Sequence, residues 1–245
     1  MKPKSITYFD ENAFLASMGR RGLPRPGKEP PEGWSKQAPD PMRMLKGHPH
    51  LKIRKGFVLR AYQFYEGGNG NAFVFAMPKG APLPDPNDVP GEKRLWDPPC
   101  PPEAMPDFMS VIEGDGSPAS YLSASMFARD VSELGAFWHG CGWSTHRILF
   151  SDPLVKEESL PRDWWDKPEF FDAISETGWR WTARRPKKWH PRVTWRKGLP
   201  CVTFFTFCGL GGQTITRFTD TFGADSYDFE TEVGCVAEGP GGYVF

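Results

Sequence analysis

The sequence predicts an α+β protein, in which a mainly antiparallel β-sheet packs on one long helix. Three observations lead to this class. Short runs of β-branched and aromatic residues fill 179–237, a Gly-rich tip joins two further runs within 57–77, and apolar residues hold helical spacing over 118–138. Because consecutive strands with short links pair antiparallel, we expect the C-terminal strands to form a meander that continues into the hairpin.

The first predicted element is the β-hairpin 57–77. Its arms, 57–65 and 72–77, are rich in β-branched and aromatic residues, and Gly67-Gly68-Asn69-Gly70 lies between them. Glycine and asparagine adopt the positive φ values that a tight hairpin turn requires. These four residues therefore predict the turn.

The long helix is predicted from about 118 to 138. Ser117 followed by Pro118 is typical of a helix start, since serine caps the first amides and proline fits the first turn. The apolar residues that follow at roughly helical spacing are Leu122, Met126, Val131, Leu134 and Phe137. A shorter helix after Asp10 is expected to bury Phe14, Leu15 and Met18 and to end at Gly19.

The C-terminal third predicts five strands with turns between them. They are 179–184, 192–196, 201–208, 213–222 and 227–237. Gly209-Leu210-Gly211-Gly212 forms the tip between the third strand and the fourth, since glycine-rich links favour hairpin turns.

We expect a single domain over 1–245, with an extended connector inside it. Residues 19–56 are rich in glycine and proline and carry almost no periodic apolar pattern. Within them, His48-Pro49-His50 is expected in an exposed polar loop. A second proline-rich stretch, 78–106, resists both helix and central strand.

The composition is proline-rich and tryptophan-rich, and its charges cancel. The chain has 26 Pro and 26 Gly, but also 19 Phe, 10 Trp and 6 Tyr, which is too much aromatic surface for a disordered chain. Thirty basic side chains balance thirty acidic ones, so the molecule has no global field for a polyanion. Any electrostatic partner must be met by a local patch.

The protein is expected to be soluble and cytoplasmic, with no membrane partner. Its first twenty residues contain no continuous apolar run, and the longest such stretch, near 202–208, is far shorter than the roughly 20 residues that cross a bilayer. The cysteines are odd in number and scattered, which fits reduced thiols. They are Cys100, Cys141, Cys201, Cys208 and Cys235.

The most unusual segment is 178–198, which predicts a basic, Trp-rich β-hairpin. Residues 179–198 hold eight basic side chains and no acidic one. Strand alternation would put the basic residues of both arms on one face, with two lysines at the tip. The predicted binding residues are Arg180, Arg184, Lys187, Lys188, Arg192 and Arg196.

Two interpretations of this basic face remain open. Like charges that face each other across a ladder repel, so an acidic group should cover them. That group is either an acidic partner or the acidic blocks of this chain, among them Asp228, Glu230 and Glu232 on one strand face. A nucleic acid, held by arginines with Trp stacking on bases, is the less favoured partner.

A second group of residues suggests metal or cysteine chemistry. His139, Cys141 and His146 lie within eight residues near the end of the predicted helix, and imidazole and thiolate are good zinc ligands. His190, Cys201 or Cys208 would supply a fourth ligand. Alternatively, Cys141 is a nucleophile with a histidine base, or it is buried in a tight helix-to-strand crossing. The spacing matches no zinc motif, so no cofactor is favoured and zinc is the alternative.

The sequence therefore favours a non-catalytic interaction protein, such as an inhibitor, an immunity-type protein or an assembly subunit. Its expected partner is a protein with an acidic surface, because Trp and Arg are common at interface hot spots. The alternative is a Cys/His-dependent enzyme or metal-binding protein centred on His139, Cys141 and His146.

Overall fold

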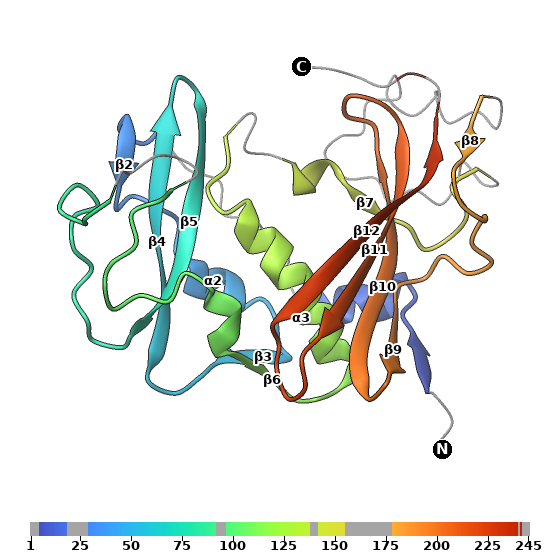
Figure 1. Cartoon of the computed structure of the whole chain (residues 1–245), viewed down its shortest axis with the longest axis horizontal. Helices are drawn as coiled ribbons and strands as arrows, with labels where there is room; N and C mark the ends of the chain where they lie inside the picture. The colour runs from blue at the N-terminus through green and yellow to red at the C-terminus, as the bar shows by residue number, and fades with distance from the viewer. Residues whose placement is uncertain are drawn as a thin grey trace. The chain divides into compact units, whose positions relative to one another are not determined.

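A computed structural model shows a mixed α+β protein that is built mostly of antiparallel sheets with few helices (Figure 1). It describes residues 5–18, 29–91, 97–137, 142–154, 178–239 and 241. The chain forms two compact units. The first unit comprises Met1–Phe14, Thr145–Phe222 and Phe229–Phe245, and the second comprises Leu15–Ser144 and Gly223–Asp228.

The first unit is a seven-stranded antiparallel sheet. Its strand order is β1-β9-β10-β11-β12-β8, and β7 also pairs with β10. The strands are β1 (Ile6–Tyr8), β7 (Arg147–Ile148), β8 (Arg180–Trp181), β9 (Arg192–Arg196), β10 (Leu199–Cys208), β11 (Thr214–Phe222) and β12 (Phe229–Glu238). The meander predicted for 179–237 is confirmed for β9 to β12, which follow one another in sequence and in the sheet (Figure 1).

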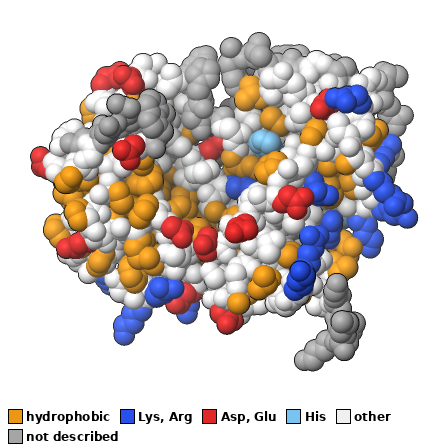
Figure 2. Space-filling view, viewed as in Figure 1, with side chains coloured by type: hydrophobic (Ala, Val, Ile, Leu, Met, Phe, Trp, Pro, Cys, Tyr) orange, Lys and Arg blue, Asp and Glu red, His pale blue; other side chains and the backbone are white. Residues whose placement is uncertain are grey.

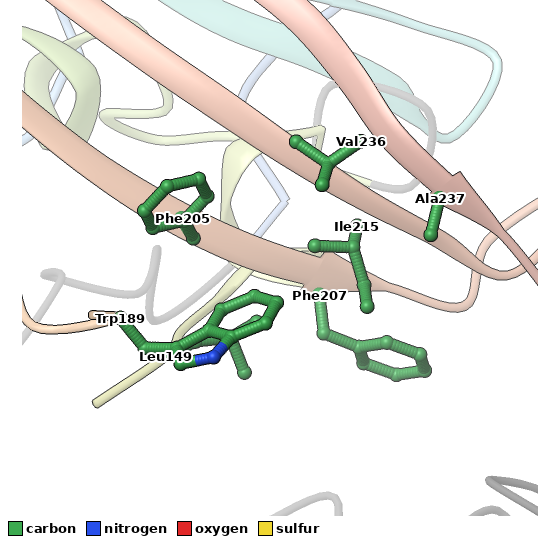
Figure 3. Packing of buried hydrophobic residues seen from close by; sticks show 7 residues of the cluster. All are labelled: Leu149, Trp189, Phe205, Phe207, Ile215, Val236 and Ala237. Atoms are coloured by element: carbon green, nitrogen blue, oxygen red, sulfur yellow. The ribbon is translucent and has the colours of Figure 1, made fainter. Parts of the chain in front are cut away.

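One face of this sheet carries a tightly packed apolar cluster. Trp189 and Leu149 lie against Phe205 and Phe207 of β10, and Ile215 of β11 and Val236 and Ala237 of β12 complete the cluster (Figure 3). The Trp189 ring contacts Phe205 at 5.2 Å between centroids. Burial of these side chains fixes the segment before β9 on the sheet.

The second unit holds the predicted hairpin in a sheet of its own. β4 (Phe57–Glu66) pairs with β5 (Asn69–Pro78), and β2 (Gly33–Ser35) pairs with β4. Gly67 and Gly68 form the turn with φ of 57° and 85°, which confirms the glycine-based prediction. The expectation that this hairpin continues into the C-terminal meander is wrong, because the two sheets share no strand pair.

The remaining elements of the second unit surround its longest helix. α3 (Pro118–Ser132) packs with β5, with β3 (Leu51–Ile53) and with β6 (Ile112–Gly114). α2 (Pro41–Leu45) lies within the stretch that was expected to be an extended connector, as do β2 and β3. α1 (Glu11–Met18) belongs to the first unit up to Phe14 and to the second from Leu15. It begins after Asp10, whose carboxylate accepts a hydrogen bond from the amide of Ala13 at 2.8 Å. Phe14 and Met18 are buried as predicted, but Leu15 is 50% exposed.

The prediction of one long helix over 118–138 is wrong. The predicted start is correct, since Ser117 caps α3 by accepting from the amide of Ser120 at 3.2 Å. The helix ends at Ser132, however, and Gly135 adopts a φ of +64°. A positive φ is incompatible with a right-handed helix, so the chain turns here. Residue 138 lies outside the described ranges.

The segment that leads into α3 is held by Asp115. Its carboxylate accepts from the amide of Ser117 at 2.9 Å and contacts Nδ1 of His50 at 2.9 Å. Burial by itself would raise the pKa of Asp115, but the hydrogen bonds with Ser117 and His50 outweigh it and hold the pKa below its usual range.

We expect Asp115→Asn to lower the free energy of unfolding at neutral pH. The ionised carboxylate stabilises the folded state above the pKa of an unfolded aspartate, about 3.9. That stabilisation is lost as the pH falls through the lowered pKa of the folded state. Urea denaturation at neutral and strongly acidic pH should show the variant less stable only at neutral pH. Glu103→Gln, which removes the charge of an exposed carboxylate, is the control, and an equal deficit at both pH values would contradict the expectation.

Candidate functional site

The two arms of the predicted basic hairpin do not pair with each other. β8 pairs with β12, whereas β9 pairs with β1 and β10. The two arms therefore lie at different places in the seven-stranded sheet, and the predicted hairpin geometry is wrong. The reason is that β10, β11 and β12 insert between the arms, which local alternation of side chains does not reveal.

The basic side chains nevertheless meet on one face of the first unit. Four predicted binding residues, Arg184, Lys187, Lys188 and Arg192, line a hollow of about 460 Å³. Arg217 of β11 is a fifth basic side chain there, and the remaining lining residues are Tyr8, Ala183, Pro186, Phe205 and Val236. We call this feature the basic hollow. Figure 2 shows Lys and Arg side chains gathered over the region where Figure 1 draws this unit.

Strand register explains why these residues share a face. Tyr8 of β1 lies opposite Arg192 of β9, and Phe205 of β10 lies opposite Arg217 of β11. Directly opposite residues in an antiparallel pair point to the same side of the sheet. Val193, the neighbour of Arg192, points to the other side and is fully buried. The alternation predicted for 192–196 therefore places Arg192 in the hollow.

Arg192 is partly buried, whereas Arg184, Lys187 and Lys188 are exposed, so we call its position the floor of the basic hollow. Its guanidinium carbon lies 5.8 Å from the centroid of the Phe205 ring. Burial lowers the pKa of Arg192, and the nearby charges of Arg196 and Arg217 lower it further, while Tyr8 raises it. No carboxylate among the described residues forms an ion pair with Arg192. An arginine in this setting keeps its charge, because its ordinary pKa lies far above neutrality.

Acidic residues of this chain neutralise only part of the basic segment. Arg180 pairs with Glu238, and Arg217 Nη2 donates to Glu232 at 2.9 Å. Arg185 Nε donates to Asp152 at 2.7 Å. Acidic residues of this chain thus neutralise the charge of Arg180 and part of the charge of Arg217. For Arg184, Lys187, Lys188, Arg192 and Arg196, the described part of the chain provides no ion pair.

The rim of the basic hollow is formed by Lys187 and Lys188. Both also line an adjacent hollow of about 460 Å³, with Tyr8, Asp10, Phe150, Ser151, Trp189 and His190. The ammonium of Lys188 lies 4.4 Å from the centroid of the Tyr8 ring, a cation–π contact. Trp189 follows immediately and is only 5% exposed, so its burial in the apolar cluster fixes the chain directly after the two lysines.

The histidines and cysteines of the predicted metal or catalytic site are not brought together where the structure describes them. His139 and Cys141 lie outside the described residues. His146 Nδ1 hydrogen-bonds Thr206 Oγ1 at 2.9 Å, whereas His190 lines the hollow next to the basic one. Cys201 contacts Thr221, and Cys208 contacts Thr145. Within the described ranges, no three His, Cys, Asp or Glu side chains are placed to hold a metal.

The residues that follow 138–141 are held by the end of α3. Trp143 Nε1 donates to Asp130 at 3.2 Å, and the amide of Ser144 donates to Glu133 at 2.8 Å. Burial raises the pKa of Glu133, although hydrogen bonds from the amides of 142–144 act in the opposite direction. The prediction of a site at Cys141 stays a prediction, but its C-terminal flank is fixed by these carboxylates.

A serine, a histidine and an aspartate meet inside the second unit, but they do not form an open site. His48 Nδ1 hydrogen-bonds Ser123 Oγ at 2.9 Å, and His48 Nε2 lies 4.0 Å from Asp130. Ser123 is completely buried and His48 is 3% exposed, so a substrate has no access. The expectation that His48 lies in an exposed loop is therefore wrong. Buried polar groups need partners, and these three residues supply them to one another.

Sequence reasoning missed three side chains of the basic hollow that carry an aromatic ring or a charge. Tyr8, Phe205 and Arg217 are distant in sequence from 178–198 and enter through β1, β10 and β11. Arg217 lies on the same side of β11 as Ile215 and Thr219, which are both buried. A charged residue between two buried positions was the signal that could have identified Arg217. The strand order that brings it beside Arg192 was not predictable from that pattern.

Comparison of the chain with known protein families, with curated proteins and with solved structures gives no match. None of the helices in the described ranges is both long and apolar enough to span a membrane.

Proposed function

We propose that this protein is a non-catalytic interaction protein that binds an acidic surface of another protein through the basic hollow. One observation carries the proposal. Arg184, Lys187, Lys188 and Arg192 line one hollow, and none of them has an ion pair within the described chain. Folding has thus gathered like charges without neutralising them, which favours an acidic group from outside.

The chemistry of the hollow supports a protein partner. Two aromatic rings, Tyr8 and Phe205, are in cation–π contact with Lys188 and Arg192. Arginine and aromatic residues commonly supply the binding energy at protein interfaces. Lysines at an exposed rim would steer an acidic partner toward the partly buried Arg192, since rim charges mainly act on the association rate.

Nucleic acid is the less favoured partner. Base stacking needs exposed aromatic rings along a groove, but Trp189 is buried and Trp181 packs edge-on against it at 6.4 Å between centroids. The acidic Glu230 and Glu232 of β12 lie on the same sheet, which would oppose a long polyanion. The alternative enzyme or metal site at His139, Cys141 and His146 stays a second hypothesis, and metal analysis of the purified protein would test it.

The proposal is tested by measuring how a charge reversal changes binding to an acidic peptide. A fluorescently labelled peptide of Glu and Asp is titrated with the protein at about 50 and about 200 mM salt. We expect Lys187→Glu with Lys188→Glu to weaken binding at least about tenfold, or about 1.4 kcal/mol, because two rim attractions become repulsions. Both lysines line the hollow, so the effect should be local.

A matched variant controls for net charge. Lys55→Glu with Lys79→Glu makes the same change at two exposed lysines of the second unit and should leave peptide affinity within about twofold. Equal losses in both variants, or no peptide binding to the unmodified protein at the lower salt, would overturn the proposal. A labelled single-stranded oligonucleotide is titrated in parallel. If the protein bound the oligonucleotide more tightly than the peptide, and with a steeper salt dependence, nucleic acid would become the favoured partner.

A further inference from the structure

The basic hollow differs from an evenly charged surface, because one arginine is set apart from the lysines. Arg192 is partly buried at the floor, whereas Lys187 and Lys188 are exposed at the rim. We propose that this floor is a binding site for a single phosphate monoester on a side chain of the partner protein, with Arg192 as the residue that binds it. We call this site the phosphate seat. This inference rests on the proposed function and specifies which group of the partner is recognised.

The position of Arg192 suits a phosphoryl group. Its side chain starts from a strand that is paired on both sides, with Tyr8 opposite on β1 and Thr203 opposite on β10. Its guanidinium lies over the Phe205 ring, 5.8 Å from the centroid. A planar guanidinium that is held in one place binds two oxygens of a phosphate with little further loss of conformational freedom.

The charge of the hollow favours a dianion over a single carboxylate. Five basic side chains line it, and Glu232 is the one carboxylate that pairs with any of them among the described residues. A phosphate monoester carries about −1.5 to −2 at neutral pH, whereas a carboxylate or a nucleic-acid phosphodiester carries one charge. A monoester therefore neutralises more of the surplus charge at one point.

Arg217 contributes its positive charge to the phosphate seat and does not bind the phosphate directly. Its Nη2 donates to Glu232 at 2.9 Å, and its Nε is buried without a hydrogen-bond partner among the described residues. Its charge lies close enough to Arg192 to lower the pKa of that residue. A dianion beside Arg192 would relieve this repulsion, so Arg217 acts as a positioning residue that raises the preference for the doubly charged ligand.

The size and walls of the hollow fit one side chain. A volume of about 460 Å³ lies within the range of small-molecule sites and is too small for a folded element. Tyr8 and Phe205 supply the aromatic walls, and Lys188 lies over the Tyr8 ring at 4.4 Å. Such a hollow accepts the end of one side chain while the rest of the partner contacts the lysine rim.

Three ring compounds with different anionic groups test the inference. Phenyl phosphate, phenyl sulfate and benzoate share one ring, but only the first becomes a dianion near neutrality. Isothermal titration calorimetry at pH 7.5 should show phenyl phosphate binding at least about tenfold more tightly than the two monoanions, a difference of about 1.4 kcal/mol. The second proton of a phosphate monoester binds with a pKa of about 6, so affinity for phenyl phosphate should fall at pH 5.

Substitution of the seat residue tests its role separately. Arg192→Lys keeps the charge but removes the planar fork, and we expect it to weaken phenyl phosphate binding about tenfold. Arg180→Lys is the control, because Arg180 pairs with Glu238 and does not line the hollow. Thermal denaturation of both variants shows whether the fold is kept. If Arg192→Lys unfolds, Lys188→Gln at the exposed rim should still weaken binding.

The outcomes separate this inference from the proposed function. Benzoate binding as tightly as phenyl phosphate, or equal affinities of Arg192→Lys and the unmodified protein, would overturn the phosphate seat. In that case, continued binding of the acidic peptide would leave the proposed function standing. The protein could also bind phenyl phosphate through Arg192 but fail to bind the acidic peptide. That result would support the phosphate seat and overturn the proposal that the partner offers a broad acidic surface.

Discussion

Trp189→Ala is expected to lower the free energy of unfolding by about 3–5 kcal/mol, the usual range for a buried tryptophan. Trp189 is 5% exposed and packs on Phe205 within the cluster that covers one face of the seven-stranded sheet (Figure 3). Its loss leaves a cavity that the β-sheet cannot close, because β10 is paired on both sides. Urea denaturation followed by far-ultraviolet circular dichroism measures the change without relying on tryptophan fluorescence.

Trp181→Ala provides the comparison. Trp181 only packs against the edge of the same cluster, and it is partly exposed, so we expect less than half of the effect. Trp189→Phe keeps an aromatic ring and should cost less than Trp189→Ala. A loss below about 1 kcal/mol for Trp189→Ala would show that the cluster does not stabilise the sheet in this way.

Gly114→Ala is expected to destabilise the protein by about 2–3 kcal/mol, since overpacking of a well-packed site costs about 1–3 kcal/mol. A Cβ at position 114 would overlap Cζ and the hydroxyl of Tyr227. Tyr227 cannot easily move. Its hydroxyl accepts from the amide of Gly116 at 2.9 Å and hydrogen-bonds Ser120 Oγ at 2.6 Å, and its ring stacks on Tyr121 at 4.9 Å. Thermal denaturation of the variant measures the loss.

A double-mutant cycle with Tyr227→Ala checks this explanation. Once the ring is absent, the methyl group at 114 has room, so the double variant should be no less stable than Tyr227→Ala alone, with a coupling of about 1–3 kcal/mol. Gly142→Ala is the matched control, because a Cβ there would make only an ordinary contact with Glu133 at 3.8 Å. Additive effects of Gly114→Ala and Tyr227→Ala would contradict the proposed overlap.

Elements with a local cause were predictable from the sequence. The turn of the hairpin follows from Gly67 and Gly68, because glycine adopts positive φ values at no steric cost. The start of α3 follows from Ser117 and Pro118, because a cap acts within one turn of the helix. β9 was predicted at its observed bounds, 192–196, since alternation of residues is a property of the strand itself.

The end of α3 was not predictable in this way. Leu134 and Phe137 continue the apolar spacing of the helix, yet Gly135 turns the chain and the amide of Phe137 donates to the carbonyl of Gly70 at 2.9 Å. The turn also brings the carbonyl of Gly135 to the side chain of Gln63 at 3.0 Å. These partners are more than 60 residues away in sequence, so a long-range contact outweighed the local periodicity.

The candidate site likewise has local features that were predictable and long-range features that were not. The unusual density of basic residues in 179–198 and the face of β9 that carries Arg192 were predictable, because composition and alternation are local. Long-range contacts were needed to show that Glu238 neutralises Arg180, and that Tyr8, Phe205 and Arg217 join Arg192 in one hollow. The physical reason is that strand order depends on how the whole sheet buries its apolar face, a sum over residues that are far apart along the chain.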